Sequence, residues 1–157
     1  MERPTAVVVS GFFSPLHDGH LDMMEAAAEL GDTLVVIVNN NAQQVAKKGK
    51  VIIDETSRLR VVNALRIVDD AFIAVDDDRT VSASLAQVAR KYDGHQVIFA
   101  NGGDRAPGFV PEQPTCEEHG IEMRFGVGGE NKADSSTRIN MALGIETEAS
   151  AVPSETT

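Results

Sequence analysis

GFFSPLHDGH, residues 11–20, is the stretch that decides the fold of this chain. The apolar run directly before it is typical of a buried strand, and residues 21–30 after it have the apolar spacing of a helix. His17 and His20 therefore fall in the first turn of a helix, just beyond the C-terminal end of a strand. Ligands bind at that end of the strands in an open α/β sheet. The free N–H groups and the positive dipole end of the helix favour an anion there, and Gly19 leaves room for a phosphate.

Apolar runs alternate with helical patterns along the rest of the chain. The predicted strands are residues 5–10, 33–39, 71–75, 96–100 and 121–126, and the predicted helices are 18–30, 54–66, 80–91, 112–119 and 135–143. This βαβα order predicts an α/β fold, a Rossmann-like three-layer sandwich with a five-stranded parallel sheet. Residues 40–53 are expected to form a long polar loop, and loops of that length are often functional.

The length and composition predict a single domain over residues 1–145 and a disordered polar tail over residues 146–157. The lone Cys116 cannot form an internal disulfide, which fits a reducing compartment. No apolar stretch approaches the roughly 20 residues that span a bilayer, and the first residues lack the pattern of a secretory signal. We therefore expect a cytoplasmic protein with no membrane partner.

The formal net charge of −10 argues against a nucleic-acid-binding surface, because such a surface needs basic side chains to neutralise phosphates. A small anionic substrate is compatible with this charge, since only the charge near the site decides its binding. The basic residues gather in one part of the chain, which holds Lys47, Lys48, Lys50, Arg58 and Arg60.

Three motifs follow one another in the order in which one superfamily carries them. His17-Asp18-Gly19-His20 matches HxGH, residues 99–105 resemble a GGD segment after a later strand, and residues 134–139 resemble ISSTxIR. On these residues the chain resembles the nucleotidyltransferase superfamily in its cytidylyltransferase-like branch, with glycerol-3-phosphate cytidylyltransferase and heptose 1-phosphate adenylyltransferase among its members. The resemblance implies that a phosphate or phosphonate oxygen attacks the α-phosphorus of a nucleoside triphosphate and releases pyrophosphate.

The resemblance also assigns catalytic roles to histidines and lysines. His17 and His20 would contact the α- and β-phosphates, because an imidazole can donate to phosphate oxygens near neutral pH. One of Lys47 and Lys48 would reach the phosphates of both substrates, whereas Lys50 is expected to be solvated.

The binding positions that the resemblance implies lie in several segments. The predicted nucleotide-binding residues are Gly11, Phe12, Phe13, Gly19, Gly102, Gly103, Asp104, Ser135, Ser136, Thr137, Arg138 and Lys132. Those in the first motif would offer backbone N–H groups to the triphosphate, while the Phe13 ring is expected to anchor the core. Arg58 would contact the acceptor phosphate. Lys132 would supply the charge of an arginine that the family carries where this chain has Glu130.

The nucleotide and the acceptor stay open at this point. We favour CTP, with ATP on a sugar phosphate or similar acceptor as the alternative and a catalytically inactive nucleotide-binding regulatory module as a further one. Mg²⁺ held mainly by the triphosphate is the expected cofactor, and Asp76-Asp77-Asp78 is expected to be a solvated loop and not a metal site. The expected partners are the nucleoside triphosphate, the small phosphorylated acceptor and a second copy of the chain in a homodimer.

Overall fold

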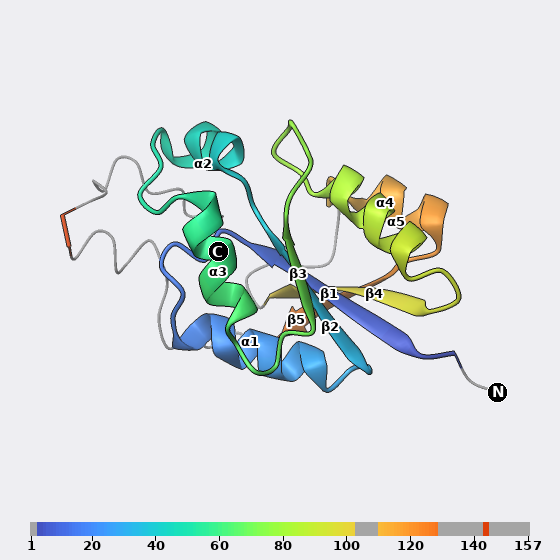
Figure 1. Ribbon diagram of the computed structural model, residues 1–157. Helices are drawn as coiled ribbons and strands as arrows, with labels where there is room; N and C mark the ends of the chain where they lie inside the picture. Colours follow the sequence, from blue (N-terminus) through green and yellow to red (C-terminus); the bar gives the residue numbers. More distant parts are fainter. Residues whose placement is uncertain (1–2, 103–109, 129–142, 145–157) are drawn as a thin grey trace.

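The computed structural model describes residues 3–102, 110–128 and 143–144. Most of the helix predicted at 135–143, and the tail predicted at 146–157, lie outside these residues. Five parallel strands form one sheet in the order β3-β2-β1-β4-β5, which confirms the predicted fold class (Figure 1). The strands are β1 (Thr5–Gly11), β2 (Thr33–Val38), β3 (Asp70–Ile73), β4 (Gln96–Gly102) and β5 (Glu122–Val127).

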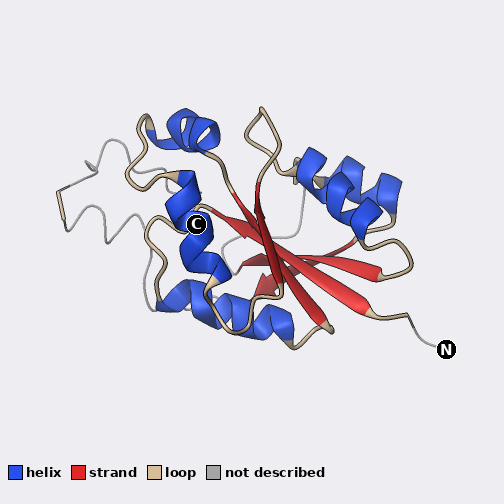
Figure 2. Cartoon of the chain, viewed as in Figure 1, coloured by secondary structure: helices blue, strands red, loops and turns tan. Residues whose placement is uncertain are grey.

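Helices cover both faces of the sheet (Figure 2). They are α1 (Asp18–Ala28), α2 (Asn41–Lys48), α3 (Glu55–Asn63), α4 (Ser82–Lys91) and α5 (Gln113–His119). One core cluster joins Met24 of α1 and Val62 of α3 to one face of the sheet, and a second joins Leu85 of α4 and Cys116 of α5 to the other. The three layers therefore have α1 and α3 on one side and α4 and α5 on the other.

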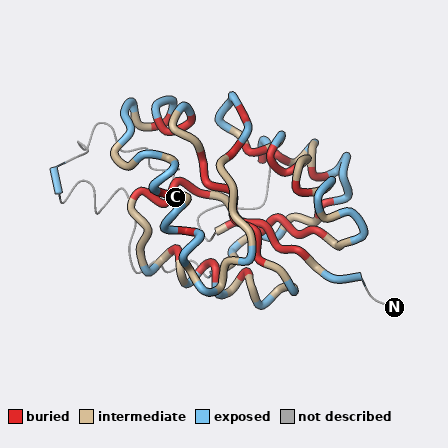
Figure 3. Tube along the Cα trace, in the orientation of Figure 1, coloured by how far each residue is buried: buried red, intermediate tan, exposed pale blue. Residues whose placement is uncertain are grey.

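The central strands are apolar on both faces because both faces are covered. Val7 and Val9 of β1 belong to the first core cluster and Val8 belongs to the second, as expected from side chains that alternate along a strand. Figure 3 shows the buried residues concentrated along these central strands. Met23 and Met24 of α1 pack in the core.

The direction of the strand order reverses beside β1. The chain leaves β1 through α1 and returns in β2 on one side, whereas β4 pairs with β1 on the other side. In an open α/β sheet, the ligand-binding crevice lies outside the C-terminal ends of the strands at such a reversal of order. The segment that follows β1, which carries His17 and His20, lies at this edge.

The loop predicted at residues 40–53 is wrong in its first half, because α2 occupies Asn41–Lys48. The side chain of Asn40 accepts from the Gln43 N–H, the Gln43 side chain accepts from the Asn40 N–H, and Gly49 ends the helix at φ 82°. The helix has no apolar stripe, since its buried residues are Gln43, Gln44 and Lys47. Hydrophobic periodicity therefore cannot reveal it.

The start of α4 also differs from the expected one. The helix begins at Ser82 and not at the predicted residue 80, and the carboxylate of Asp76 accepts from the backbone N–H groups of Ala83 and Ser84. Asp76 is buried, so the Asp76-Asp77-Asp78 run is not solvated throughout. Asp54 caps α3 by accepting from the Thr56 N–H.

Among the described residues, no helix is both long enough and apolar enough to cross a membrane.

Candidate active site

His17 and His20 hold each other at the start of α1. His17 is the N-cap residue, with extended backbone at φ −149° and ψ 177°, and its Nδ1 accepts from the Gly19 N–H at 3.0 Å. The Nδ1 of His20 accepts from the His17 N–H at 3.3 Å, which completes a reciprocal capping box. The two rings are stacked with their centroids 3.9 Å apart. The structure thus brings the two predicted catalytic histidines together on one helix terminus.

This capping arrangement decides which nitrogen of each ring carries the proton. A neutral imidazole has one donor nitrogen and one acceptor nitrogen. Because Nδ1 accepts a backbone N–H in both His17 and His20, the neutral form of each ring carries its proton on Nε2. Both Nε2 atoms are thereby prepared to donate to an anion, at a helix terminus whose dipole also favours negative charge.

Phe13 links this terminus to the core. Its ring is 2% exposed and meets the His20 ring edge-on, with the centroids 4.9 Å apart. A Cβ at position 11 would lie 3.0 Å from the Phe13 Cζ, so the ring needs the glycine that the sequence has there. Phe13 takes a φ of 54°, a conformation that L residues rarely adopt, where the chain turns from β1 to α1. The predicted role of Phe13 as a core anchor is confirmed.

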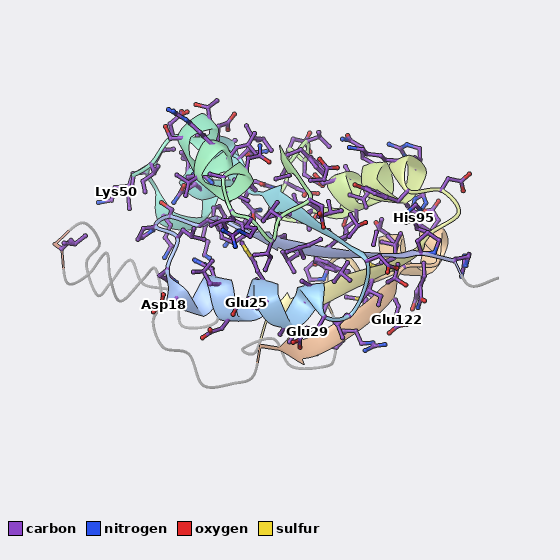
Figure 4. All side chains as sticks on the ribbon, turned by 60° about the horizontal axis from the view of Figure 1, so that its bottom comes forward. Asp18, Glu25, Glu29, Lys50, His95 and Glu122 are labelled. Carbon is purple, nitrogen blue, oxygen red and sulfur yellow. The ribbon has the colours of Figure 1, made fainter. Side chains whose placement is uncertain are left out.

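Lys47 lies over the ring of Phe12. Its Nζ is 4.7 Å from the ring centroid, a cation–π distance, and its side chain is 9% exposed. Lys48 follows it at the end of α2 and is half-buried. Lys50 is exposed, and Figure 4 shows it at the same end of the molecule as Asp18, the first residue of α1. The lysines of α2 therefore belong to the edge of the sheet that carries the histidines.

The sequence predicts that Arg58 contacts the acceptor phosphate, but in the structure its side chain is buried among protein groups. The side chain is 1% exposed, and four hydrogen bonds occupy its guanidinium. Nε donates to the Ile53 carbonyl at 2.8 Å, Nη1 to the carbonyls of Phe12 at 3.0 Å and Asn39 at 2.6 Å, and Nη2 to the Asn41 Oδ1 at 3.1 Å. Arg58 is therefore a positioning residue, because its hydrogen bonds hold the loops after β1 and β2 together.

The surroundings of Arg58 act on its charge in opposite directions. Burial lowers the pKa of Arg58, while the carboxylates of Glu55 and Asp54 raise it. The side-chain hydrogen bond from Thr56 is the main reason that the pKa of Asp54 falls to about 2, followed by the bond from Asn41. The Asp54 carboxylate at the start of α3 thus remains ionised near neutral pH, beside a guanidinium whose charged form burial disfavours.

Two residues of the site escaped sequence reasoning. Asn39, directly after β2, is 7% exposed; its carbonyl receives Arg58 and its Nδ2 donates to the Gln43 Oε1 at 3.0 Å. Gly128, at the end of β5, has a φ of 89°, and a Cβ there would lie 2.8 Å from the Cα of Met23. The sequence signal for Asn39 is the run of asparagines that follows the apolar strand β2. The signal for Gly128 is the pair of glycines that follows β5.

Seven of the predicted nucleotide-binding residues lie outside the described residues. They are Gly103, Asp104, Lys132, Ser135, Ser136, Thr137 and Arg138. Gly102 is the last residue of β4, at the C-terminal end of that strand. His95 is half-buried and lies at the opposite end of the molecule from Asp18 and Lys50 (Figure 4). Within the described ranges, no three His, Cys, Asp or Glu side chains are grouped to hold a metal ion.

Cys116 takes no part in this site. Its side chain is 1% exposed in the core beneath α5, and burial, together with Glu112 and Glu117, raises the pKa of its thiol to about 11. A thiol with so high a pKa stays protonated near pH 7 and is a poor nucleophile. Cys116 therefore packs in the core and is not a nucleophile of this site.

Two curated proteins resemble parts of this chain. Bifunctional protein HldE of Streptomyces coelicolor is 35% identical over 121 residues, which are 76% of this chain and 24% of that protein. The FAD synthase of Archaeoglobus profundus is 44% identical over 72 residues, 46% of each chain. The chain thus spans about a quarter and about half of these two curated relatives.

A solved structure and a family model agree with these relatives. The lipopolysaccharide core biosynthesis protein of Thermoplasma volcanium matches with a TM-score of 0.62 and 26% identity, over 83% of this chain and 99% of that one. The model of the cytidylyltransferase-like family matches residues 8–144, which include the HxGH segment and most of the sheet. This chain therefore belongs to the cytidylyltransferase-like family.

Proposed function

We propose that this protein is a nucleotidyltransferase that transfers a nucleoside monophosphate to a small acceptor bearing a phosphate or phosphonate. The observation that carries the proposal is the reciprocal capping of His17 and His20, which prepares both Nε2 atoms as donors at the N-terminus of α1. Phosphoryl oxygens are the ligands that such a terminus favours. Membership of the cytidylyltransferase-like family supports the same reaction.

In the proposed reaction, an anionic oxygen of the acceptor forms a bond to the α-phosphorus of the nucleotide. The bond from that phosphorus to the oxygen bridging it to the β-phosphorus breaks, and pyrophosphate leaves with the electron pair. No strong base is required, because the attacking oxygen is already ionised. Catalysis then depends on position and on stabilising the charge of the transition state. His17 and His20 would donate to oxygens on the α- and β-phosphates, and Lys47 or Lys48 would add positive charge beside them.

The similarity to known proteins helps to choose between ATP and CTP as the nucleotide. The sequence favoured CTP, which stays a prediction. Resemblance to an FAD synthase supports ATP instead, since FAD contains adenosine monophosphate joined through a pyrophosphate. We therefore propose ATP as the first nucleotide to test and CTP as the second.

Mg²⁺ fits this site as an ion held mainly by the triphosphate. His17 and His20 offer imidazole nitrogens and the first turn of α1 offers backbone N–H groups, which bind phosphate oxygens well and Mg²⁺ poorly; the same turn also carries the carboxylate of Asp18. The ion would neutralise charge on the departing pyrophosphate.

The test is a pyrophosphate-release assay on the full chain with ATP, CTP, GTP and UTP. Each nucleotide is combined with a panel of phosphorylated acceptors that includes FMN, glycerol 3-phosphate and hexose 1-phosphates, with and without Mg²⁺. Release that depends on one nucleotide and one acceptor supports the proposal and identifies both. Calorimetric binding of a nucleotide without release from any combination would replace it with the inactive nucleotide-binding module.

A further inference from the structure

Gln44 carries a buried hydrogen-bond acceptor that none of the described residues uses. Its side chain is 2% exposed, and within the described part of the chain no donor reaches its Oε1. Leaving a buried carbonyl oxygen without a donor costs free energy, so such atoms are rare and call for an explanation. The unpartnered oxygen of Gln44 therefore needs an explanation.

The preceding residue shows how α2 satisfies a buried glutamine. The Gln43 Oε1 accepts from the Asn39 Nδ2 and from the Asn40 N–H, each at 3.0 Å. Its Nε2 donates to the carbonyls of Asp78 at 2.9 Å and Thr80 at 2.8 Å. Gln43 is thus satisfied at both ends of its amide, while its neighbour leaves an oxygen unused.

Gln44 lies on the part of α2 that faces the candidate active site. It stands three residues after Asn41, whose Oδ1 accepts from Arg58, and three residues before Lys47, whose Nζ lies over the Phe12 ring. Residues three apart share one face of an α-helix. Asn41 is hydrogen-bonded to Arg58, which holds the loop after β1, and Lys47 contacts Phe12 of that loop. Gln44 therefore lies between two residues of the site.

We infer that the Gln44 Oε1 receives a hydrogen bond from a hydroxyl group of the acceptor substrate, an inference that rests on the proposed function. A carbonyl oxygen binds a donor and disfavours an anion, so Gln44 does not recognise the phosphate itself. Lys47, about 5 Å further along the helix axis, supplies the positive charge that a phosphate requires. Gln44 and Lys47 together therefore select a molecule whose hydroxyl lies about 5 Å from its phosphate, as in a polyol or sugar phosphate.

The position of α2 relative to β1 also fits an acceptor site. The crevice of the strand order lies between β1 and β4, whereas α2 follows β2 on the other side of β1. A nucleotide in the crevice would then have its α-phosphate at His17 and His20 and leave α2 to the second substrate.

The experiment measures binding by calorimetry and uses Gln44→Leu, which has nearly the same size and lacks the acceptor. The probes are glycerol 3-phosphate, ribitol 5-phosphate and mannose 1-phosphate, each beside its deoxy analogues. In the wild-type protein, at least one hydroxylated probe should bind about fivefold to tenfold more tightly than an analogue lacking one hydroxyl, the discrimination of one neutral hydrogen bond. In Gln44→Leu the two should bind equally, through weaker binding of the hydroxylated probe. Equal binding in the wild-type protein, an unchanged preference in the variant or no binding of any probe overturns the inference.

A stability measurement separates recognition from a structural role. Gln43→Leu should lower Tm, because four hydrogen bonds are lost, whereas Gln44→Leu should keep or raise it. If Gln44→Leu does not fold, Gln44→Met provides the same loss of the acceptor in a more adaptable side chain, and failure of both variants to fold overturns the inference. Discrimination between probes without pyrophosphate release would defeat the proposed function alone, and release with no role for Gln44 would defeat this inference alone.

Discussion

Arg58 Nη1 donates a hydrogen bond of 3.0 Å to the backbone carbonyl of Phe12, a residue 46 positions earlier in the chain. The same nitrogen donates to the carbonyl of Asn39 at 2.6 Å. One guanidinium on α3 thus joins the loop that follows β1 to the segment that follows β2. The loop bearing His17 and His20 therefore depends on a side chain that is itself too buried to contact substrate.

Replacing Arg58 with methionine should lower the free energy of unfolding by about 2–4 kcal/mol, since several buried carbonyls lose their donor. Urea denaturation followed by circular dichroism measures this change. Arg60→Met is the matched control, because Arg60 is exposed on the same helix and its loss should change stability little. Equal stability of the two variants would contradict the positioning role of Arg58.

His17→Asn should separate the capping role of His17 from its chemical role. Asparagine is a preferred N-cap residue, so this variant should keep α1 and its Tm close to wild type. It lacks an imidazole Nε2, so turnover should fall by about 10²–10⁴-fold, the scale of a lost transition-state donor. Pyrophosphate release under saturating substrates is the measurement.

His17→Ala is the companion variant and should lose both roles, with the helix cap worth about 0.5–2 kcal/mol. His20→Ala should lose turnover to a similar extent. Turnover near wild type in both His17→Asn and His20→Ala would remove the histidines from the mechanism.

Lys47→Ala and Lys48→Ala should each raise KM for a substrate or lower kcat, because both lysines add positive charge at the end of α2. Lys50→Ala should leave both constants within about twofold of wild type, since an exposed cation is screened by solvent. Initial-rate kinetics with each substrate varied in turn distinguish the three. If Lys50 is essential while Lys47 and Lys48 are dispensable, the segment after α2, and not α2 itself, binds the phosphates.

Cys116 should make the protein less stable at alkaline pH. Its folded pKa of about 11 exceeds the ordinary value of 9.0, so between these values the unfolded chain loses a proton that the folded chain keeps. Stability from this source is full below pH 9 and is lost as pH rises towards 11. The fall in Tm from pH 8.5 to pH 10.5 should be smaller in Cys116→Ala than in wild type, and an equal fall would refute the assignment.

The sequence by itself determined the layers of the fold and the place of the histidines. Continuous valine runs in β1 and β2 predict strands buried on both faces, and the strand–HxGH–helix order places two imidazoles at a helix terminus. These features are local, because the pattern of apolar residues and the cap of a helix are set within one turn or one strand. The family resemblance was also carried by such local segments, and the match over residues 8–144 confirmed it.

Only the tertiary structure decided the course of α2 and the roles of its neighbours. Gln43 is buried because its amide meets carbonyls 35 and 37 residues away, and Arg58 is buried because carbonyls 19 and 46 residues away accept its N–H groups. A polar residue in a sequence looks solvated until the partners that satisfy it are in place. Those partners come from distant segments that the folded sheet brings to one edge, so no local pattern distinguishes a buried glutamine or arginine from an exposed one.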